Sequence, residues 1–150
     1  RVSKRNYYLD IAGTVLERAT CLRRVYGAII VKNDEIISTG YNGAPRGRKN
    51  CVDLGYCTRE QLKVPRGERY ELCRSVHAEA NAITKVAKSA NNCDGSTLYI
   101  TAAPCIECSK LIIQAGIRRV VYSEDYRSEE GLNLLRRVGI ECVQYELNEK

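Results

Sequence analysis

The 150-residue chain contains no methionine, tryptophan or phenylalanine, so its aromatic side chains are all tyrosines. Its apolar runs break at residues such as Lys32 and Ser38, and none approaches the roughly 18 residues that a membrane-spanning helix needs. It also lacks an apolar leader with a small-residue cleavage site, so we expect a cytoplasmic protein with no membrane partner. Internal repeats, linkers and low-complexity tracts are absent, and the length suits one domain over residues 1–150.

The charge of the chain is positive and unevenly distributed. Its 24 basic and 18 acidic residues give a formal net charge of +6, and a hydrophobic content of 44% is that of an ordinary globular protein. Residues 46–74 alone hold eight basic residues against four acidic ones. We therefore expect an anionic partner, attracted chiefly by this segment.

Eight cysteines accompany a single histidine, His77. Disulfides are uncommon in cytoplasmic proteins, so metal ligation explains this number of cysteines better than disulfide pairing does. Having only one histidine excludes a histidine-rich zinc site.

Hydrophobic spacing predicts helices and strands in alternation. The first helix, residues 6–23, is expected to bury an apolar stripe from Tyr8 to Leu22. The order of the elements indicates one sheet, parallel in its later part, with helices on both faces. The other predicted helices are residues 77–89, 104–115 and 129–138, and the predicted strands are residues 28–32, 35–41, 97–101, 119–122 and 140–145.

Residues 42–74 show no periodicity and are punctuated by glycine and proline, which predicts a basic, cysteine-containing loop. A loop of this length inside a small domain is usually functional.

Two short motifs together supply the ligands of a catalytic zinc site. His77-Ala78-Glu79 and Pro104-Cys105-Ile106-Glu107-Cys108 each lie at the predicted start of a helix, where unpaired N–H groups and the helix dipole favour thiolates. One imidazole and two thiolates leave the fourth zinc position for water, and Glu79 can take a proton from that water. Taken separately, the histidine fits a helix cap and Cys-x-x-Cys fits a redox pair. The two motifs in this order favour zinc.

The pattern His-x-Glu followed by Pro-Cys-x-x-Cys marks zinc-dependent nucleobase deaminases. More narrowly, the chain resembles deoxycytidylate (dCMP) deaminases over nearly its whole length, and Gly40-Tyr41-Asn42-Gly43-Ala44-Pro45 is the stretch that narrows the resemblance. The fold implied by the resemblance is a three-layer α/β/α sandwich with a mixed five-stranded sheet. The resembling segments are residues 20–23, 27–31, 39–45, 77–83, 98–101, 104–108 and 111–117.

The resemblance implies an enzyme that deaminates dCMP to dUMP by hydrolysis, for thymidylate supply, with Zn²⁺ as its cofactor. By the family pattern the zinc ligands are His77, Cys105 and Cys108. Glu79 is the catalytic residue, which moves protons to N3 of cytosine and to the departing ammonia.

The same pattern implies three substrate contacts. The backbone N–H of Ala78 is expected to contact the base, Asn42 the sugar and Tyr126 the phosphate side. A turn position for Asn42 and ordinary packing of Tyr126 are the alternatives.

Four further cysteines lie in or near the basic loop. Some relatives hold a second, structural zinc ion partly by cysteines at the places of Cys21 and Cys51, and Cys57 and Cys73 are available here to complete a four-thiolate site. Such a site would order a loop that is poor in apolar residues. Four buried or reactive thiols without a metal are the alternative.

Many dCMP deaminases are homo-oligomers, hexamers among them, that dCTP activates and dTTP inhibits. The resemblance implies an effector site at Gly43, Pro45 and Gly47. Val25-Tyr26 departs from the family pattern, because relatives often carry a polar or basic residue there, so the sequence leaves effector control open.

Two other functions fit parts of the sequence. A tRNA adenosine deaminase, or another nucleobase deaminase, would use the same zinc motif, and an RNA substrate would account for the charge. The loop with Asn42 and the segment 112–116 argue against RNA. A zinc-stabilised nucleic-acid-binding module without catalysis would have no use for Glu79. We therefore predict a dCMP deaminase and expect no nucleic-acid partner.

Overall fold

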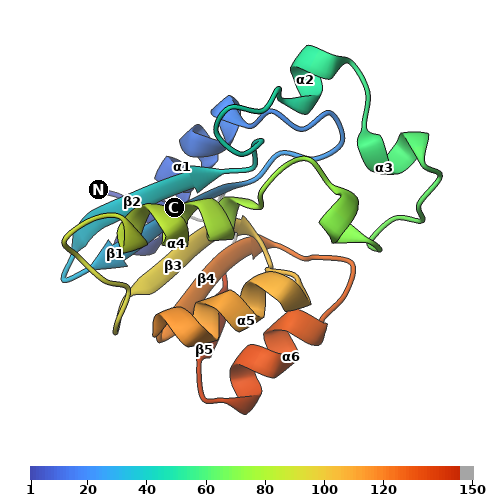
Figure 1. The fold of residues 1–150 in the computed structure, drawn as a ribbon. Coiled ribbons are helices and arrows are strands. Elements are labelled where there is room, and N and C mark those ends of the chain that lie inside the picture. The colour runs from blue at the N-terminus through green and yellow to red at the C-terminus, as the bar shows by residue number, and fades with distance from the viewer. Residues whose placement is uncertain (146–150) are drawn as a thin grey trace.

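The computed structural model describes residues 1–145, so residues 146–150 of the predicted domain lie outside it. One five-stranded sheet has the strand order β2-β1-β3-β4-β5 (Figure 1). β1 runs antiparallel to β2 and β3, whereas β3, β4 and β5 are parallel, so the sheet is mixed, as the sequence predicts. The strands are β1 Gly27–Lys32, β2 Glu35–Tyr41, β3 Thr97–Ala102, β4 Arg119–Glu124 and β5 Glu141–Gln144.

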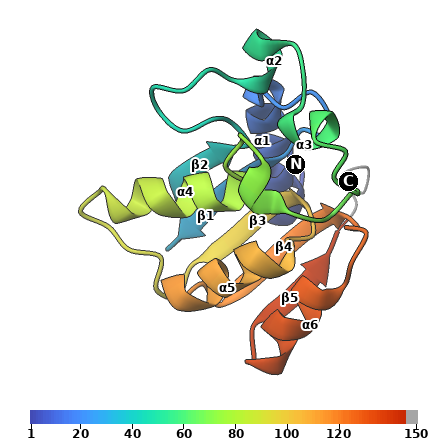
Figure 2. The ribbon, with the colours of Figure 1, turned by 45° about the vertical axis from the view of Figure 1, so that its right-hand side comes forward.

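Helices cover both faces of the sheet, which confirms the three-layer α/β/α arrangement (Figures 1 and 2). One apolar core lies under α1, around Leu9, Ile29 and Tyr99. A larger core lies under α4, α5 and α6 and includes Ile112 and Leu135. The four helices are α1 Lys4–Val15, α4 Ala78–Ala87, α5 Ile106–Ala115 and α6 Glu130–Arg137.

The first helix is shorter than predicted. α1 ends at Val15 and a 3-10 turn, η1 (Leu16–Arg18), follows, so residues 19–23 are not helical. In this segment the Thr20 N–H donates instead to the carbonyl oxygen of Asn42. Leu22, expected on the buried stripe, is 47% exposed. A contact with a residue distant in the sequence here takes the place of the helical hydrogen bonds that the pattern predicts.

The basic loop between β2 and α4 contains three short helical turns, α2 (Cys51–Leu54), α3 (Thr58–Gln61) and the 3-10 turn η2 (Tyr70–Leu72). Its two ends are joined, because Gly43 and Val76 exchange two backbone hydrogen bonds of 3.2 and 2.7 Å. In Figure 1, α2 and α3 lie outside the sheet, at the upper right. The bridge between Gly43 and Val76 brings the chain back to β2 directly before His77.

The remaining helices and strands begin and end within two residues of their predicted bounds. No helix in residues 1–145 combines the length and the apolar composition that crossing a bilayer requires.

Candidate active site and metal centre

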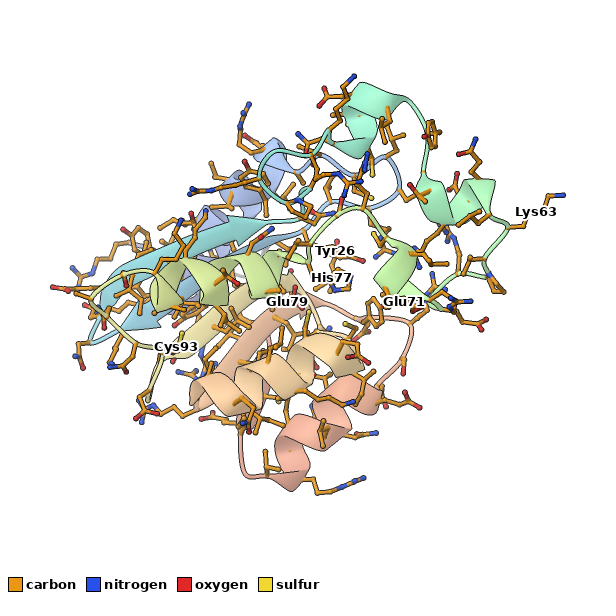
Figure 3. All side chains as sticks on the ribbon, in the orientation of Figure 1. Tyr26, Lys63, Glu71, His77, Glu79 and Cys93 are labelled. Atoms are coloured by element: carbon orange, nitrogen blue, oxygen red, sulfur yellow. The ribbon has the colours of Figure 1, made fainter. Side chains whose placement is uncertain are left out.

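The two predicted zinc motifs meet at one end of the sheet. His77 and Cys105 have extended backbones and directly precede α4 and α5, respectively. β3 ends at Ala102, so its carboxyl end leads straight into the segment that carries Cys105. Figure 3 shows His77 and Glu79 together at the start of α4, whereas Cys93 lies beyond the other end of that helix. Crevices at the carboxyl ends of strands are the usual ligand sites of such sheets.

The donor atoms of His77, Cys105 and Cys108 fit a tetrahedral zinc ion. All of them lie within 4.8 Å of one another. His77 Nδ1 is 3.3 Å from Cys108 Sγ and 3.5 Å from Cys105 Sγ. Zn–N bonds of about 2.0–2.1 Å and Zn–S bonds of about 2.3 Å put nitrogen and sulfur ligands about 3.5 Å apart. His77 Nδ1 therefore stands at the separation from both sulfurs that a shared zinc ion requires.

The two thiols interact strongly with each other. The hydrogen bond from Cys108, together with His77, lowers the pKa of the Cys105 thiol to about 4. The same hydrogen bond and burial raise the pKa of Cys108 above its ordinary value. Because zinc is bound by thiolates, binding of the ion would release the proton that the two thiols share.

Glu79 lies in the first turn of α4 and is buried, with 5% of its surface exposed. Burial raises the pKa of this carboxyl group to about 7, although the charge of His77 opposes the shift. A carboxyl group with a pKa near neutrality can both accept and donate a proton at physiological pH, as a general acid–base catalyst must.

Two glycines let the elements around the site approach closely. A Cβ atom at Gly40 in β2 would lie 2.3 Å from the carbonyl oxygen of Ala78, and one at Gly131 in α6 would lie 2.4 Å from the carbonyl oxygen of Pro104. Both neighbours are backbone atoms, so no larger residue fits without moving the chain. Gly40 therefore sets the position of α4, and Gly131 sets that of the segment before Cys105.

The pocket above Glu79 is lined by positive charge. Glu79 is the one carboxylate among its lining residues in the described part of the chain. The five arginines in the lining come from the segment before β1, from the basic loop and from the β4–α6 connection: Arg23, Arg24, Arg59, Arg66 and Arg127. Two of them lie in the segment 46–74 that the sequence singles out, and three do not.

Asn42 lines the pocket but is also engaged with the backbone. Its side-chain oxygen accepts a hydrogen bond from the Tyr26 N–H, and its side-chain amide donates to the carbonyl of Arg24, both at 2.8 Å. The residue is 4% exposed. It therefore braces the segment before β1, while its predicted contact with a sugar stays a prediction.

Of the other two predicted substrate contacts, Tyr126 lines the pocket, and Ala78 is a buried residue between His77 and Glu79, which line it. Ala78 is the first residue of α4, and the N–H of a first helical residue has no partner within its helix. Tyr126 lines the pocket and also packs against the larger core. Packing and substrate contact are thus compatible for Tyr126.

The predicted effector residues have visible structural roles. Gly43 is buried and forms the bridge to Val76. The carbonyl of Pro45 accepts a hydrogen bond from the Arg48 N–H, and Gly47 has a φ of 82°. Effector binding at these three residues stays a prediction.

The four further cysteines do not assemble like the first group. Within residues 1–145, His77, Cys105 and Cys108 are the one set of three metal-ligand side chains whose donor atoms come that close together. Burial raises the pKa values of Cys51 and Cys73, and the charges of neighbouring thiols of the group add to both shifts. Cys21, Cys51, Cys57 and Cys73 therefore lie near one another without forming a finished four-thiolate site.

The sequence does not identify several residues of the site. Gly40 and Gly131 act through close approaches, and Arg23, Arg24 and Arg127 reach the pocket from outside the basic loop. Tyr70, in η2, packs against His77. Of these residues, only Arg23 and Arg24 could have been noticed in the sequence, because they are two adjacent basic residues close to Cys21.

Comparison with known proteins places this site in a family context. Residues 2–124 match the family model of the cytidine and deoxycytidylate deaminase zinc-binding region. A deoxycytidylate deaminase of Schizosaccharomyces pombe is 34% identical over 148 residues, which are 97% of this chain and 45% of the relative. The deoxycytidylate deaminase of Enterobacteria phage T4 is also 34% identical, over 92% of this chain and 88% of its own length. The chain thus spans less than half of the yeast relative and most of the phage one.

A solved structure shows the same fold. The dCMP deaminase from the cyanophage S-TIM5, in complex with dCMP and dUMP, superposes with a TM-score of 0.81 and 34% sequence identity. The superposition covers 97% of this chain and 98% of the cyanophage chain.

Proposed function

The chain belongs to the family of proteins with a cytidine and deoxycytidylate deaminase zinc-binding region, and we propose that it deaminates dCMP to dUMP by hydrolysis. One observation carries the proposal: a buried Glu79 stands beside three zinc ligands at the base of an arginine-lined pocket. The choice of dCMP as the substrate is supported by the relatives named deoxycytidylate deaminase and by the cyanophage complex with dCMP and dUMP.

In the proposed reaction, each residue at the base of the pocket has a separate task. His77, Cys105 and Cys108 would hold the zinc ion. The ion would act as a Lewis acid that makes water nucleophilic at neutral pH. Glu79 accepts a proton from water and passes it to N3 of cytosine. It then accepts the proton of the hydroxyl group added at C4 and passes it to the amino group, which leaves as ammonia. Because its pKa is raised to about 7, both transfers are accessible at neutral pH. The N–H of Ala78 orients the base.

The arginines in the pocket lining favour a phosphorylated substrate over a nucleoside. A 5′-phosphate is a dianion near neutral pH, and guanidinium groups recognise it by charge and by paired hydrogen bonds. Asn42 and Tyr126, which line the same pocket, are the proposed sugar and phosphate-side contacts. The positive net charge of the basic loop would help to attract the nucleotide.

Deaminase activity is expected with dCMP and not with deoxycytidine. The measurement is the change in ultraviolet absorbance when the zinc-loaded protein is offered dCMP, deoxycytidine, dCTP and cytidine in parallel. Without the phosphate we expect kcat/KM to fall by about 100-fold or more, since hydrogen bonds to charged groups contribute about 1.5–3 kcal/mol each. Equal rates on dCMP and deoxycytidine would refute the role of the arginines. Inertness of zinc-loaded protein toward all four, with activity on an adenosine-containing RNA stem-loop, would refute the dCMP assignment.

We also propose that Cys21, Cys51, Cys57 and Cys73 close around a second, structural zinc ion. Support comes from their proximity, since the thiols influence one another's pKa values, and three of them lie in the basic loop while Cys21 precedes β1. Elemental analysis of protein purified with zinc is expected to find two zinc ions per chain, and one in a Cys57→Ser variant. Cys142→Ser, which changes a half-buried thiol on β5, is the control and should leave the zinc content unchanged. One zinc ion per wild-type chain would refute the second site.

The predicted homo-oligomer and its regulation by dCTP and dTTP belong to the same proposal. They rest on the resemblance to dCMP deaminases and on the predicted effector residues Gly43, Pro45 and Gly47.

A further inference from the structure

We propose that Tyr70 is a positioning residue for His77, and that Arg59 holds Tyr70 in place. The inference rests on the proposed zinc site, to which it adds two residues of the basic loop. The basic loop would then support a zinc ligand as well as contribute positive charge to the pocket.

The side chain of Tyr70 packs directly on the metal-binding imidazole. The ring centroids of Tyr70 and His77 are 5.0 Å apart and the ring planes meet at 81°, an edge-to-face contact. Aromatic pairs favour this arrangement because the positive edge of one ring faces the negative surface of the other. The contact therefore fixes the plane of the imidazole as well as its place.

The orientation of the imidazole matters because its two nitrogens are not equivalent. Nδ1 faces both Cys105 Sγ and Cys108 Sγ, at 3.5 and 3.3 Å. A turn of the ring about its bond to Cβ would carry Nδ1 away from the sulfurs. Groups that orient a metal-binding histidine typically contribute about 10- to 100-fold in metal affinity or activity.

Tyr70 is itself held by Arg59, which follows the first residue of α3. The Arg59 guanidinium carbon lies 4.6 Å from the centroid of the Tyr70 ring, within the range of a cation–π contact. The same guanidinium donates a 3.0 Å hydrogen bond from Nη1 to the carbonyl of Glu68, two residues before the tyrosine. Arg59 therefore fixes both the ring and the backbone that leads to it.

The element that carries Arg59 is also anchored. Glu60, the next residue of α3, forms a 2.9 Å ion pair with Arg23, whose side chain is only 11% exposed. A continuous set of contacts thus runs from the segment before β1, through α3 and Tyr70, to His77.

The backbone adopts an uncommon conformation directly before Tyr70. Arg69 has φ 52° and ψ 50°, the left-handed region that a non-glycine residue enters at a cost. Its side chain pairs with Glu71 at 2.7 Å. Glu71 is labelled in Figure 3, on the turn that faces His77. The turn at Arg69 is what directs η2, and the Tyr70 ring with it, toward the metal ligands.

The test compares zinc retention in Tyr70→Leu, which keeps apolar volume but removes the ring, with Tyr70→Phe, which keeps the ring. Zinc-loaded proteins are mixed with a chromogenic chelator, and the rate and extent of zinc transfer are measured without substrate. We expect Tyr70→Leu to bind zinc about 10-fold more weakly, Arg59→Met to show a smaller loss of the same kind, and Tyr70→Phe to stay within about threefold of wild type. The visible spectrum of the Co²⁺-loaded protein should change in Tyr70→Leu and not in Tyr70→Phe.

Arg5→Met is the matched control, because Arg5 lies over a different ring, that of Tyr145, at 5.9 Å and away from the site. It should change neither zinc retention nor the Co²⁺ spectrum. Wild-type zinc retention in Tyr70→Leu with a raised KM would make Tyr70 a substrate contact and overturn the proposal. Equal losses in Tyr70→Leu and Tyr70→Phe would also overturn it. Since zinc transfer is read without substrate, a wrong assignment of dCMP leaves this test intact.

Discussion

Replacing Glu79 with glutamine is expected to lower kcat for dCMP by about 10³–10⁴-fold, the upper part of the range for general acid–base catalysis, while zinc stays bound. Glutamine has nearly the same shape as glutamate, but its amide can neither accept nor return the proton. Because Glu79 is buried and its pKa is raised to about 7, the substitution also removes a group that is costly to ionise. We therefore expect the free energy of unfolding to stay equal to that of wild type or to rise. Steady-state kinetics, elemental analysis and urea denaturation of the one variant measure the three quantities.

Glu107→Gln is the control for Glu79→Gln. Glu107 stands between the two zinc-binding cysteines in sequence, but it is exposed on α5 and does not line the pocket above Glu79. Its substitution should leave kcat and zinc content unchanged. Substantial turnover by Glu79→Gln, with zinc bound, would show that another group moves the proton.

Gly40→Ala is expected to lower the free energy of unfolding by about 3 kcal/mol, the upper end of the usual cost of overpacking. The added methyl group would lie 2.3 Å from the Ala78 carbonyl oxygen and 2.6 Å from the Ala82 nitrogen, both backbone atoms of α4. Since side-chain rotation cannot relieve such contacts, α4 must shift away from β2. His77 and Glu79 move with it, so zinc affinity and turnover should fall together with stability. Urea denaturation and chelator competition measure the two effects.

Gly13→Ala adds the same methyl group but is expected to raise the free energy of unfolding, so it is the control for Gly40→Ala. Gly13 lies in α1, and an added Cβ atom there would meet no atom within 4 Å. Alanine in a helix interior should raise the free energy of unfolding by about 0.5–1 kcal/mol. Wild-type stability and zinc binding in Gly40→Ala would mean that β2 and α4 are not in the contact described.

Residues whose roles depend on near neighbours in the chain could be predicted from the sequence. The strand from residue 35 to 41 and the helices on either side of β3 follow from periodicity, which each segment carries by itself. His77 and Glu79 share one helix start, and Cys105 and Cys108 share another, so each half of the metal centre is a local motif.

Residues whose roles depend on distant neighbours could not be predicted. Residues 19–23 leave the predicted helix, the Thr20 N–H donates to the carbonyl of the distant Asn42, and Leu22 is exposed. Gly40 and Gly131 look like any other glycines until α4 and the Pro104 carbonyl are placed beside them. Tyr70 lies in a segment without periodicity, and only the folded loop brings its ring against His77.

The bridge between Gly43 and Val76 makes the basic loop an exchangeable module. Because its two ends already lie side by side, joined by a pair of backbone hydrogen bonds, a loop of another length can be inserted there without changing the course of β2 or α4. The zinc ligands and Glu79 lie outside this module, whereas Arg59, Arg66 and Tyr70 lie within it. Evolution or design can therefore alter the arginines that line the pocket by grafting loops, provided that each graft supplies a new support for His77.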